Sequence, residues 1–310
     1  MYLTVGICTW NRAELLDQTL NSLRRLVVPH SLQWEVLVVN NNCTDRTDEV
    51  IAAQADHLPL CRLFEPTPGK SHALNLAVRE ARGEYILWTD DDVLVEPDWM
   101  QCYAEAFAQW PEAAVFGGPI RPWFSNTPPD WLERVLPVVA NAYAVRDLGD
   151  IPVLLSRDAL PFGANMAVRM KEQRQYLYDT RLGPRPGSAV RGEEVELVLK
   201  MLDAGVQGRW VPKAAVYHHI PLHRQSISYL ASYYRGAGEG NALRRLNAKR
   251  GNQSADGTLL KLSMRALVEE MKYRIRRVHS EPEVWIRHLI RVNIAWGEVS
   301  AAKQAPKIGT

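Results

Sequence analysis

The sequence of 310 residues lacks a long apolar run, a cysteine framework and an internal repeat. No segment reaches the roughly 18 apolar residues of a membrane-spanning helix. Residues 1–9 lack the basic flank and apolar core of a signal peptide. The four cysteines, at positions 8, 43, 61 and 102, have no metal-ligand spacing and are few for a disulfide framework. We therefore expect a cytoplasmic protein.

The net charge of +2 hides an asymmetry along the chain. From Arg235 to the end there are 15 Lys and Arg against 7 acidic residues, a balance of +8 that leaves −6 for residues 1–234. A basic region of this kind suits an anionic or phosphate-rich surface, although a solvated helical face gives the same pattern.

Strand-like and helix-like patterns alternate along the N-terminal half at the pace of βαβ units. This alternation predicts an α/β fold, with a mostly parallel sheet and helices on both faces. We expect strands at residues 3–8, 35–39, 60–64, 85–89, 113–117, 208–211 and 214–217, and helices at 14–26, 47–55, 71–83, 98–110 and 192–204.

Residues 118–161 are rich in Pro, Trp and Asn and have weak periodicity. We expect a loop region there, whose rigid aromatic side chains either shape a binding surface or cover a sheet edge. From Ser226 onward the pattern is helical, and a flexible tail is expected after residue 299.

Three consecutive carboxylates, Asp90, Asp91 and Asp92, directly follow an apolar strand-like stretch. Adjacent acids repel one another and resist burial, so a cation is expected to neutralise them. A divalent metal is the simplest candidate, because ligands of open α/β sheets bind beyond the carboxyl ends of strands. A solvated acidic turn is the alternative.

Six short segments carry a resemblance that extends over residues 1–220. They lie, in order, at residues 4–12, 38–45, 69–75, 90–92, 163–165 and 192–194. In this order they resemble the motifs of family-2 glycosyltransferases. The resemblance implies a GT-A fold, the Rossmann-like α/β architecture of that family, and transfer of a sugar from a nucleotide-sugar donor with inversion.

The resemblance also implies which residues bind the donor. The turn after the first strand is expected to bind the base and ribose of the donor. The turn after the second strand is expected to contact the base or ribose as well. The turn at Gly69 is expected to place a cation over the diphosphate. Where the family usually has Asp after the second strand, this chain has Asn40, which leaves the nucleobase open. The donor-binding residues expected from these positions are Thr9, Asn11, Arg12, Asn40, Asn41, Lys70, Asn75, Asp90, Asp91 and, for the sugar, Asn165.

The metal and the catalytic base follow from the same resemblance. Asp92 and Asp90 are expected to hold Mn²⁺ or Mg²⁺, with His218 or His219 completing the coordination. At the start of a helix, Glu194 is expected to act as the general base beside Glu193. Acidic residues in a first helical turn also occur simply because they favour the helix dipole.

The C-terminal region combines apolar and basic residues at helical spacing. Residues 259–277 and 285–294 each have an apolar face beside a cationic one. Such helices either pack on the catalytic domain or lie peripherally at the inner face of an anionic membrane. Lipid-linked acceptors would give the second arrangement a use.

The expected organisation is a catalytic domain at residues 1–222, a basic helical region at 223–298 and a flexible tail at 299–310. Within the catalytic domain, residues 1–117 form the nucleotide-binding part and 118–222 the part for acceptor and donor sugar. The expected partners are a nucleotide-sugar, with a UDP-sugar favoured, and a glycan or lipid-linked saccharide acceptor, but no nucleic acid. A non-catalytic carbohydrate-binding or assembly module and a sugar nucleotidyltransferase are the alternatives, the latter disfavoured because residues 9–12 lack a glycine-rich loop.

Overall fold

The computed structural model describes residues 1–188, 190–248 and 255–304. Its larger sheet has seven strands in the order β3-β2-β1-β4-β8-β6-β9. The strands are β1 (Tyr2–Thr9), β2 (Gln33–Asn40), β3 (Leu60–Phe64), β4 (Tyr85–Asp90), β6 (Ala113–Gly117), β8 (Met166–Arg169) and β9 (Gln207–Trp210). All neighbours pair in parallel except β8, which is antiparallel to both β4 and β6. The predicted α/β fold with a mostly parallel sheet is confirmed.

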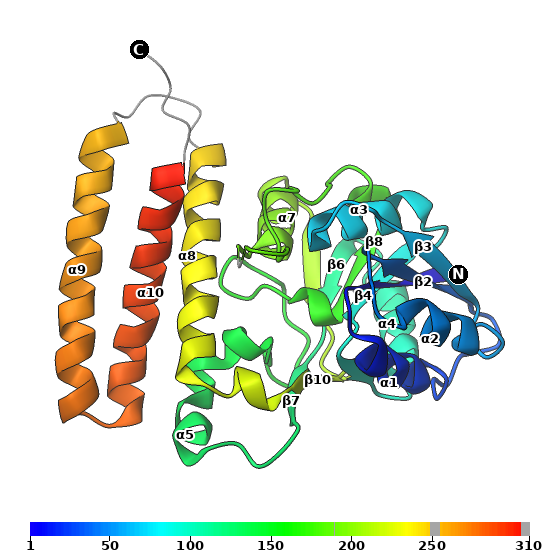
Figure 1. The fold of residues 1–310 in the computed structure, drawn as a ribbon. Helices are drawn as coiled ribbons and strands as arrows, with labels where there is room; N and C mark the ends of the chain where they lie inside the picture. The colour runs from blue at the N-terminus through cyan, green and yellow to red at the C-terminus, as the bar shows by residue number, and fades with distance from the viewer. Residues whose placement is uncertain (189, 249–254, 305–310) are drawn as a thin grey trace. The chain divides into compact units, whose positions relative to one another are not determined.

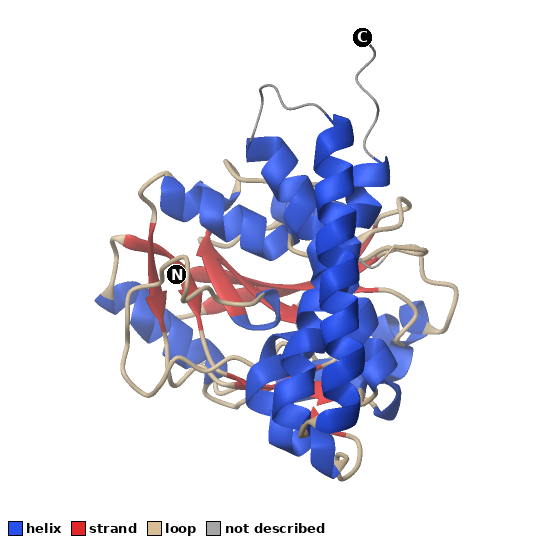
Figure 2. Ribbon diagram, turned by 90° about the vertical axis from the view of Figure 1, so that its left-hand side faces the viewer, coloured by secondary structure: helices blue, strands red, loops and turns tan. Residues whose placement is uncertain are grey.

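Helices cover both faces of this sheet (Figure 2). One face packs against α1 (Ala13–Leu23), α2 (Thr47–Gln54) and α4 (Trp99–Gln109), and the other against α3 (Lys70–Glu80), α6 (Met170–Gln173) and α7 (Glu193–Asp203). Residues 36–39 of β2 are all buried, as expected for a parallel strand that is covered on both sides. The two cores fix the carboxyl ends of β1, β2 and β4 at one edge of the sheet.

A second, three-stranded sheet has the order β5-β10-β7. It consists of β5 (Val93–Val95), β10 (Val216–Ile220) and β7 (Ile120–Phe124). The antiparallel pairing of β10 with β5 places His218 opposite Val93, directly after the acidic run. This pairing brings together residues that lie far apart in the sequence.

The chain forms two compact units. The first consists of Met1–Trp123, Tyr143–Arg181 and Glu193–His219, and the second of Phe124–Ala142, Leu182–Gly192 and Ile220–Thr310. The chain therefore passes between the units several times, whereas the sequence suggested one boundary near residue 222. Hydrogen bonds from Tyr229 to the Ala142 carbonyl and from Gln225 to Asn126 tie the segment at Phe124–Ala142 to the second unit.

The second unit is helical and contains α5 (Asp130–Val139), α8 (Ile227–Ala248), α9 (Ala255–His279) and α10 (Pro282–Gln304). Three short 3₁₀ turns, η1 (Ala140–Tyr143), η2 (Gly163–Asn165) and η3 (Leu222–Arg224), complete the described elements. α10 packs against both α8 and α9 and lies between them (Figure 1). No helix within the described ranges is long and apolar enough to cross a membrane.

Two expectations for irregular segments need correction. Residues 118–161 contain α5, because Leu132, Val135 and Val139 are spaced to bury one face of a helix. The expected flexible tail overlaps α10, which continues to Gln304 because Val299 is buried near Ala266. Residues 305–310 lie outside the described part of the chain.

Candidate functional site

The three acids lie at the carboxyl end of β4, in the first unit. β4 ends at Asp90, and Asp91 and Asp92 form the turn into β5. Asp91 and Asp92 are buried, whereas the side chain of Asp90 is 23% exposed. Burial of two adjacent carboxylates requires nearby positive charge, as the sequence predicted.

Asp90, Asp92 and His218 form a group that fits a divalent metal ion. One ligand atom from each lies within 4.8 Å of the other two. The His218 Nε2 atom is 3.4 Å from Asp92 Oδ1, and among the described residues nothing hydrogen-bonds to the buried Nδ1 atom of His218. Two carboxylates and one imidazole leave room for water and phosphate oxygens, which suits a hard ion such as Mn²⁺ or Mg²⁺.

His219 takes a different position from His218. Its backbone N–H donates to the Asp92 carbonyl at 2.8 Å, and its ring lies 4.7 Å from that of Trp123. Consecutive residues of a strand point to opposite faces, so only one of the two histidines can face the carboxylates. The geometry makes His218 the better candidate ligand, and the metal role of either histidine stays a prediction.

Arg12 neutralises the two buried acids. Its Nη1 donates to Asp91 Oδ1 at 2.8 Å and to Asp92 Oδ2 at 3.0 Å, while the hydroxyl of Thr9 donates to Asp91 Oδ2 at 2.8 Å. The charge of Asp91 raises the pKa of Arg12 above its ordinary value. Burial raises the pKa of Asp91, although Arg12 opposes this effect. Arg12 and Thr9, expected at the nucleotide, thus also hold the acidic turn in place.

Lys70 connects the acidic turn to the candidate base. Its Nζ donates to Asp90 Oδ1 at 2.9 Å and to Glu194 Oε1 at 2.8 Å. Burial alone would lower the pKa of Lys70, but the charges of Asp90, Glu194 and Glu193 outweigh it and raise the pKa well above its ordinary value. Lys70 therefore stays an ammonium ion between two carboxylates.

Glu194 is positioned by the start of α7 and by a close backbone approach at Gly163. A Cβ atom at Gly163 would lie 2.2 Å from Glu194 Oε1, so only glycine leaves room for this carboxylate. Glu193, the first residue of α7, is buried and only 4% exposed. Glu194 is the one of the two that accepts a hydrogen bond from Lys70, and it is partly exposed.

Two further residues beside Lys70 were not expected from the sequence. Cys8 and Tyr178 line the same small cleft as Lys70, Asp90 and Glu194. The buried Tyr178 hydroxyl has no hydrogen-bond partner among the described residues, and burial raises its pKa well above the ordinary value. Cys8 lies within the segment at residues 4–12 but had no expected role, and Tyr178 lies outside all six segments, so the fold alone places both beside Lys70.

Three asparagines that were expected at the nucleotide hold turns at this edge of the sheet. Asn11 has a φ of 52°, which asparagine tolerates, and its Oδ1 accepts from the Thr44 N–H at 2.7 Å. Asn40 donates to Asp48 at 2.6 Å and accepts from the Cys43 N–H. Asn41 donates to the Thr67 carbonyl and accepts from the Gly69 N–H at 2.8 Å. Direct binding of the nucleotide by these residues stays a prediction.

Asn165 and Asn75 both hydrogen-bond within the fold, and their expected contacts with the ligand stay predictions. The fully buried Asn165 accepts from Trp99 Nε1 and the Tyr103 hydroxyl, each at 2.8 Å. Its amide nitrogen donates to the carbonyls of Pro119 and Ala214. In Asn75 both ends of the amide bond the backbone of Tyr178 at 2.9 Å. The four bonds of Asn165 occupy all the donor and acceptor positions of its amide, whereas Asn75 keeps one N–H and one acceptor position beyond its two bonds.

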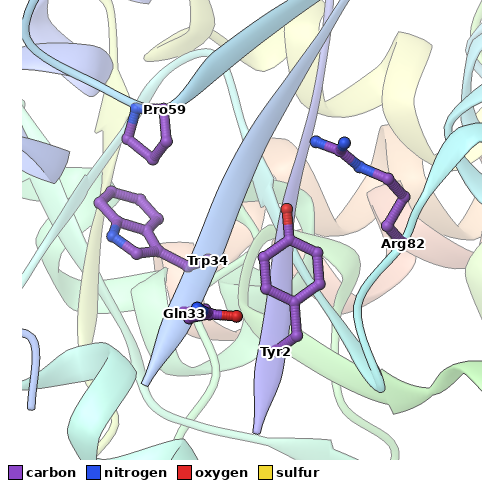
Figure 3. A pocket seen from close by; sticks show the side chains of 5 residues that line it. All are labelled: Tyr2, Gln33, Trp34, Pro59 and Arg82. Carbon is purple, nitrogen blue, oxygen red and sulfur yellow. The ribbon is translucent and has the colours of Figure 1, made fainter. Parts of the chain in front are cut away.

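A second pocket is lined by Tyr2, Gln33, Trp34, Pro59 and Arg82 (Figure 3). It lies where β1 and β2 begin, at the opposite edge of the sheet from the acidic run. The Arg82 guanidinium is 5.9 Å from the centroid of the Tyr2 ring. These lining side chains include no carboxylate, so they supply neither a metal ligand of the predicted kind nor a general base.

Comparisons with known proteins identify related sequences. The family model for Glycosyl transferase family 2 matches residues 4–151. The chain is 27% identical over 238 residues to the succinoglycan biosynthesis protein ExoM of Rhizobium meliloti. This alignment covers 74% of the chain and 71% of ExoM. It is 31% identical to validoxylamine A glucosyltransferase of Streptomyces hygroscopicus subsp. jinggangensis over 48% of this chain and 36% of that protein.

Solved structures share the fold at low sequence identity. The mannosyltransferase PcManGT from Pyrobaculum calidifontis, in complex with GDP-Man and Mn²⁺, matches with a TM-score of 0.59 and 20% identity over 99% of this chain and 76% of that one. TarS 1–349 of S. aureus, in complex with UDP, matches with a TM-score of 0.56 and 14% identity over 98% of this chain and 92% of that one. The predicted GT-A fold is thereby confirmed.

Proposed function

The chain belongs to glycosyltransferase family 2, and from this premise we propose that it transfers a sugar from a nucleoside diphosphate to a hydroxyl of a glycan or lipid-linked saccharide. One observation carries the proposal. Lys70 joins Asp90, a member of the metal-binding group, to Glu194, the candidate base. An inverting transferase needs one group that stabilises the departing diphosphate and another that takes the proton of the acceptor hydroxyl on the opposite face of the anomeric carbon. This arrangement offers a candidate for each.

A divalent metal ion, when bound by Asp90, Asp92 and His218, would stabilise the negative charge of the diphosphate leaving group. Mn²⁺ is supported by the complex of PcManGT, and Mg²⁺ suits the same carboxylate oxygens. Lys70 supplies a second positive charge beside Asp90, and a diphosphate can accept a hydrogen bond from its ammonium group.

Glu194 is proposed to remove the proton of the acceptor hydroxyl. As that oxygen forms a bond to the anomeric carbon, the bond from this carbon to the β-phosphate oxygen breaks. The nucleoside diphosphate leaves with the electron pair, and the proton resides on Glu194. A single displacement of this kind inverts the anomeric configuration. Of the two acids that begin α7, Glu194 lines the cleft, and Asp90 in the same cleft is assigned to the metal-binding group, so the proposal has one base and one displacement.

A UDP-sugar is the favoured donor, and a growing saccharide the favoured acceptor. TarS, whose structures hold UDP and UDP-GlcNAc, resembles the chain in both sequence and fold. PcManGT holds GDP-Man, so a guanosine donor is the main competitor. The name of ExoM refers to succinoglycan biosynthesis, which supports a polysaccharide or its lipid-linked precursor as acceptor.

Turnover of a sugar-nucleotide panel tests the proposal. We expect release of UDP from one UDP-sugar when Mn²⁺ and a saccharide acceptor are present, and loss of this activity in Asp92→Ala. Asp130→Ala, an acid at the start of α5, is the matched control and should keep the parent rate. NMR of the product should show the inverted anomer. A retained anomer would exclude the single displacement, and equal activity of Asp92→Ala would exclude the metal site.

A further inference from the structure

An apolar stripe runs along the exposed side of α9. Its side chains are 45–76% exposed, although a large apolar side chain in water is unfavourable. They recur at steps of three, four or one residue, which places them on one face of a helix. The stripe consists of Met264, Leu267, Val268, Met271, Ile275 and Val278.

The opposite face of α9 already supplies the packing that holds the helix. Leu259, Leu262 and Ala266 pack with Ala295 and Val299 of α10. The sequence left open whether the C-terminal apolar residues pack inside the protein or face a membrane. In α10 they are buried, as Ile286 and Leu289 show, whereas the α9 stripe stays exposed.

Charges around the stripe are strongly biased. Residues 259–279 contain six Lys and Arg against two Glu. Glu270 accepts from Trp296 Nε1 of α10 at 2.8 Å. Within α9, Glu269 pairs with Lys272 and Glu270 with Arg274. Exposed cations flank the stripe at Lys261, Lys272 and Arg274, of which the last two also pair with the two Glu residues, so the net charge of this segment is +4. Long basic side chains beside an apolar face can extend to the phosphates of an interface.

We infer that α9 is a docking surface for an anionic lipid bilayer, with the stripe in the interfacial layer and the flanking cations at the headgroups. From Met264 to Val278 the helix is about 21 Å long, enough to lie flat along a membrane. A second copy of the chain is a poorer partner, because pairing two stripes would bring two positive rims together. The inference goes beyond the proposed function, since it uses no residue of the site at the end of β4.

Co-sedimentation of the full chain with vesicles tests this inference. The protein is expected to bind vesicles of phosphatidylcholine that contain about one third phosphatidylglycerol. Its partition coefficient for pure phosphatidylcholine should be lower by roughly five-fold for each cation that contacts the anionic headgroups. Binding to the anionic vesicles should fall as salt is raised, because salt screens the headgroup charge. Equal binding to both vesicle types, or none to either, would overturn the inference.

Two variants separate the stripe from a general effect of charge. Leu267→Glu with Met271→Glu places acids in the middle of the stripe and should lower the partition coefficient by more than about ten-fold. Ile151→Glu, the same kind of change at a residue that is 74% exposed in the other unit, should leave binding unchanged. Circular dichroism checks that both variants fold. A dimer in light scattering that only the stripe variant abolishes would assign the stripe to a second copy and overturn the lipid assignment.

Discussion

Lys70 lies between two carboxylates that come from distant parts of the chain. Asp90 ends β4 and Glu194 begins α7, and each accepts a hydrogen bond from the same ammonium group. Since a donor diphosphate would offer stronger acceptors, Lys70 is suited to shift toward the phosphate and release Glu194 for proton transfer. In the proposed mechanism, the position of this one lysine would link donor binding to the availability of the base.

Replacing Lys70 by alanine should weaken donor binding. A hydrogen bond to a charged group is worth about 1.5–3 kcal/mol, so the KM for the nucleotide-sugar should rise at least about ten-fold. Lys70→Arg keeps the charge and should lose less. Lys213→Ala removes an exposed lysine and serves as the control in steady-state kinetics. An unchanged KM in Lys70→Ala would separate Lys70 from the donor.

Glu194→Gln should abolish the proposed base while preserving shape and hydrogen bonding to Lys70. A positioned base contributes about 10²- to 10⁴-fold in rate, so kcat should fall by that factor with little change in donor affinity. Glu49→Gln, in the first turn of α2, makes the same change at an equivalent helical position and should be silent. If kcat of Glu194→Gln stayed within a few-fold of the parent, another group would have to accept the proton.

At the scale of elements, Asn165 connects η2 to α4 and to the segments before β7 and β10. Asn165→Ala leaves the indole of Trp99 and the hydroxyl of Tyr103 without their acceptor in the core. The expected loss of unfolding free energy is about 3 kcal/mol or more, measured by denaturant titration. In the protein that stays folded at low temperature, the KM for the donor should match the parent. A raised KM with unchanged stability would support the role in sugar binding.

Glu35 connects β1, β2 and the turn after α3. It accepts from the Thr4 hydroxyl and the Arg82 N–H, each at 2.8 Å, and from Arg82 Nε at 2.7 Å. Burial would raise the pKa of Glu35, but the hydrogen bonds from Arg82 and Thr4 outweigh it and lower the pKa below its ordinary value.

This lowered pKa sets the sign of a pH effect on stability. The ionised form favours the folded state, so the contribution of Glu35 is full above its unfolded pKa of about 4.3 and is lost as pH falls through the lower folded pKa. Glu35→Gln should therefore cost about 1–3 kcal/mol at neutral pH, and this difference should shrink in acid. Glu80→Gln, an exposed acid on α3, is the control for denaturation curves across pH. A difference that did not change with pH would contradict the linkage.

At the scale of the whole molecule, all the residues of the candidate site belong to the first unit, and the apolar stripe of α9 belongs to the second. The charge asymmetry in the sequence follows a similar division. Residues 1–234, which contain the candidate site, carry a net charge of −6, and the residues from Arg235 onward, which contain the apolar stripe of α9, carry +8.

The sequence predicted the elements whose apolar spacing lies within the element itself. The parallel strands and their helices were predicted because long apolar runs and helical spacing occur within each element. β5 and β8 were missed because each has only three or four residues, and β8 is held by β4 and β6 rather than by its own sequence. The segment at Asp130–Val139 was read as a loop because its prolines obscured one helical face.

In the candidate site, too, the sequence predicted the residues within one motif but not the contacts between motifs. The acids at the end of β4 were predictable, since they directly follow an apolar strand. Lys70 and Glu194 are 124 positions apart, so their contact could only come from the fold. The choice between His218 and His219 depended on the pairing of β10 with β5. The hydrogen bonds that Asn165 accepts from Trp99 and Tyr103 likewise became visible only in the fold.

Calorimetric titration of UDP, with GDP and dTDP for comparison, tests the central claim most directly. The titration is made with Mn²⁺ and with EDTA, on the parent, Asp92→Ala, His218→Ala and the control His219→Ala. The account predicts that UDP binds the parent and His219→Ala in Mn²⁺, and that EDTA, Asp92→Ala or His218→Ala removes this binding. Absence of binding by all three nucleotides in both conditions, or binding that ignores EDTA and both ligand variants, would contradict a metal-dependent nucleotide site at the end of β4.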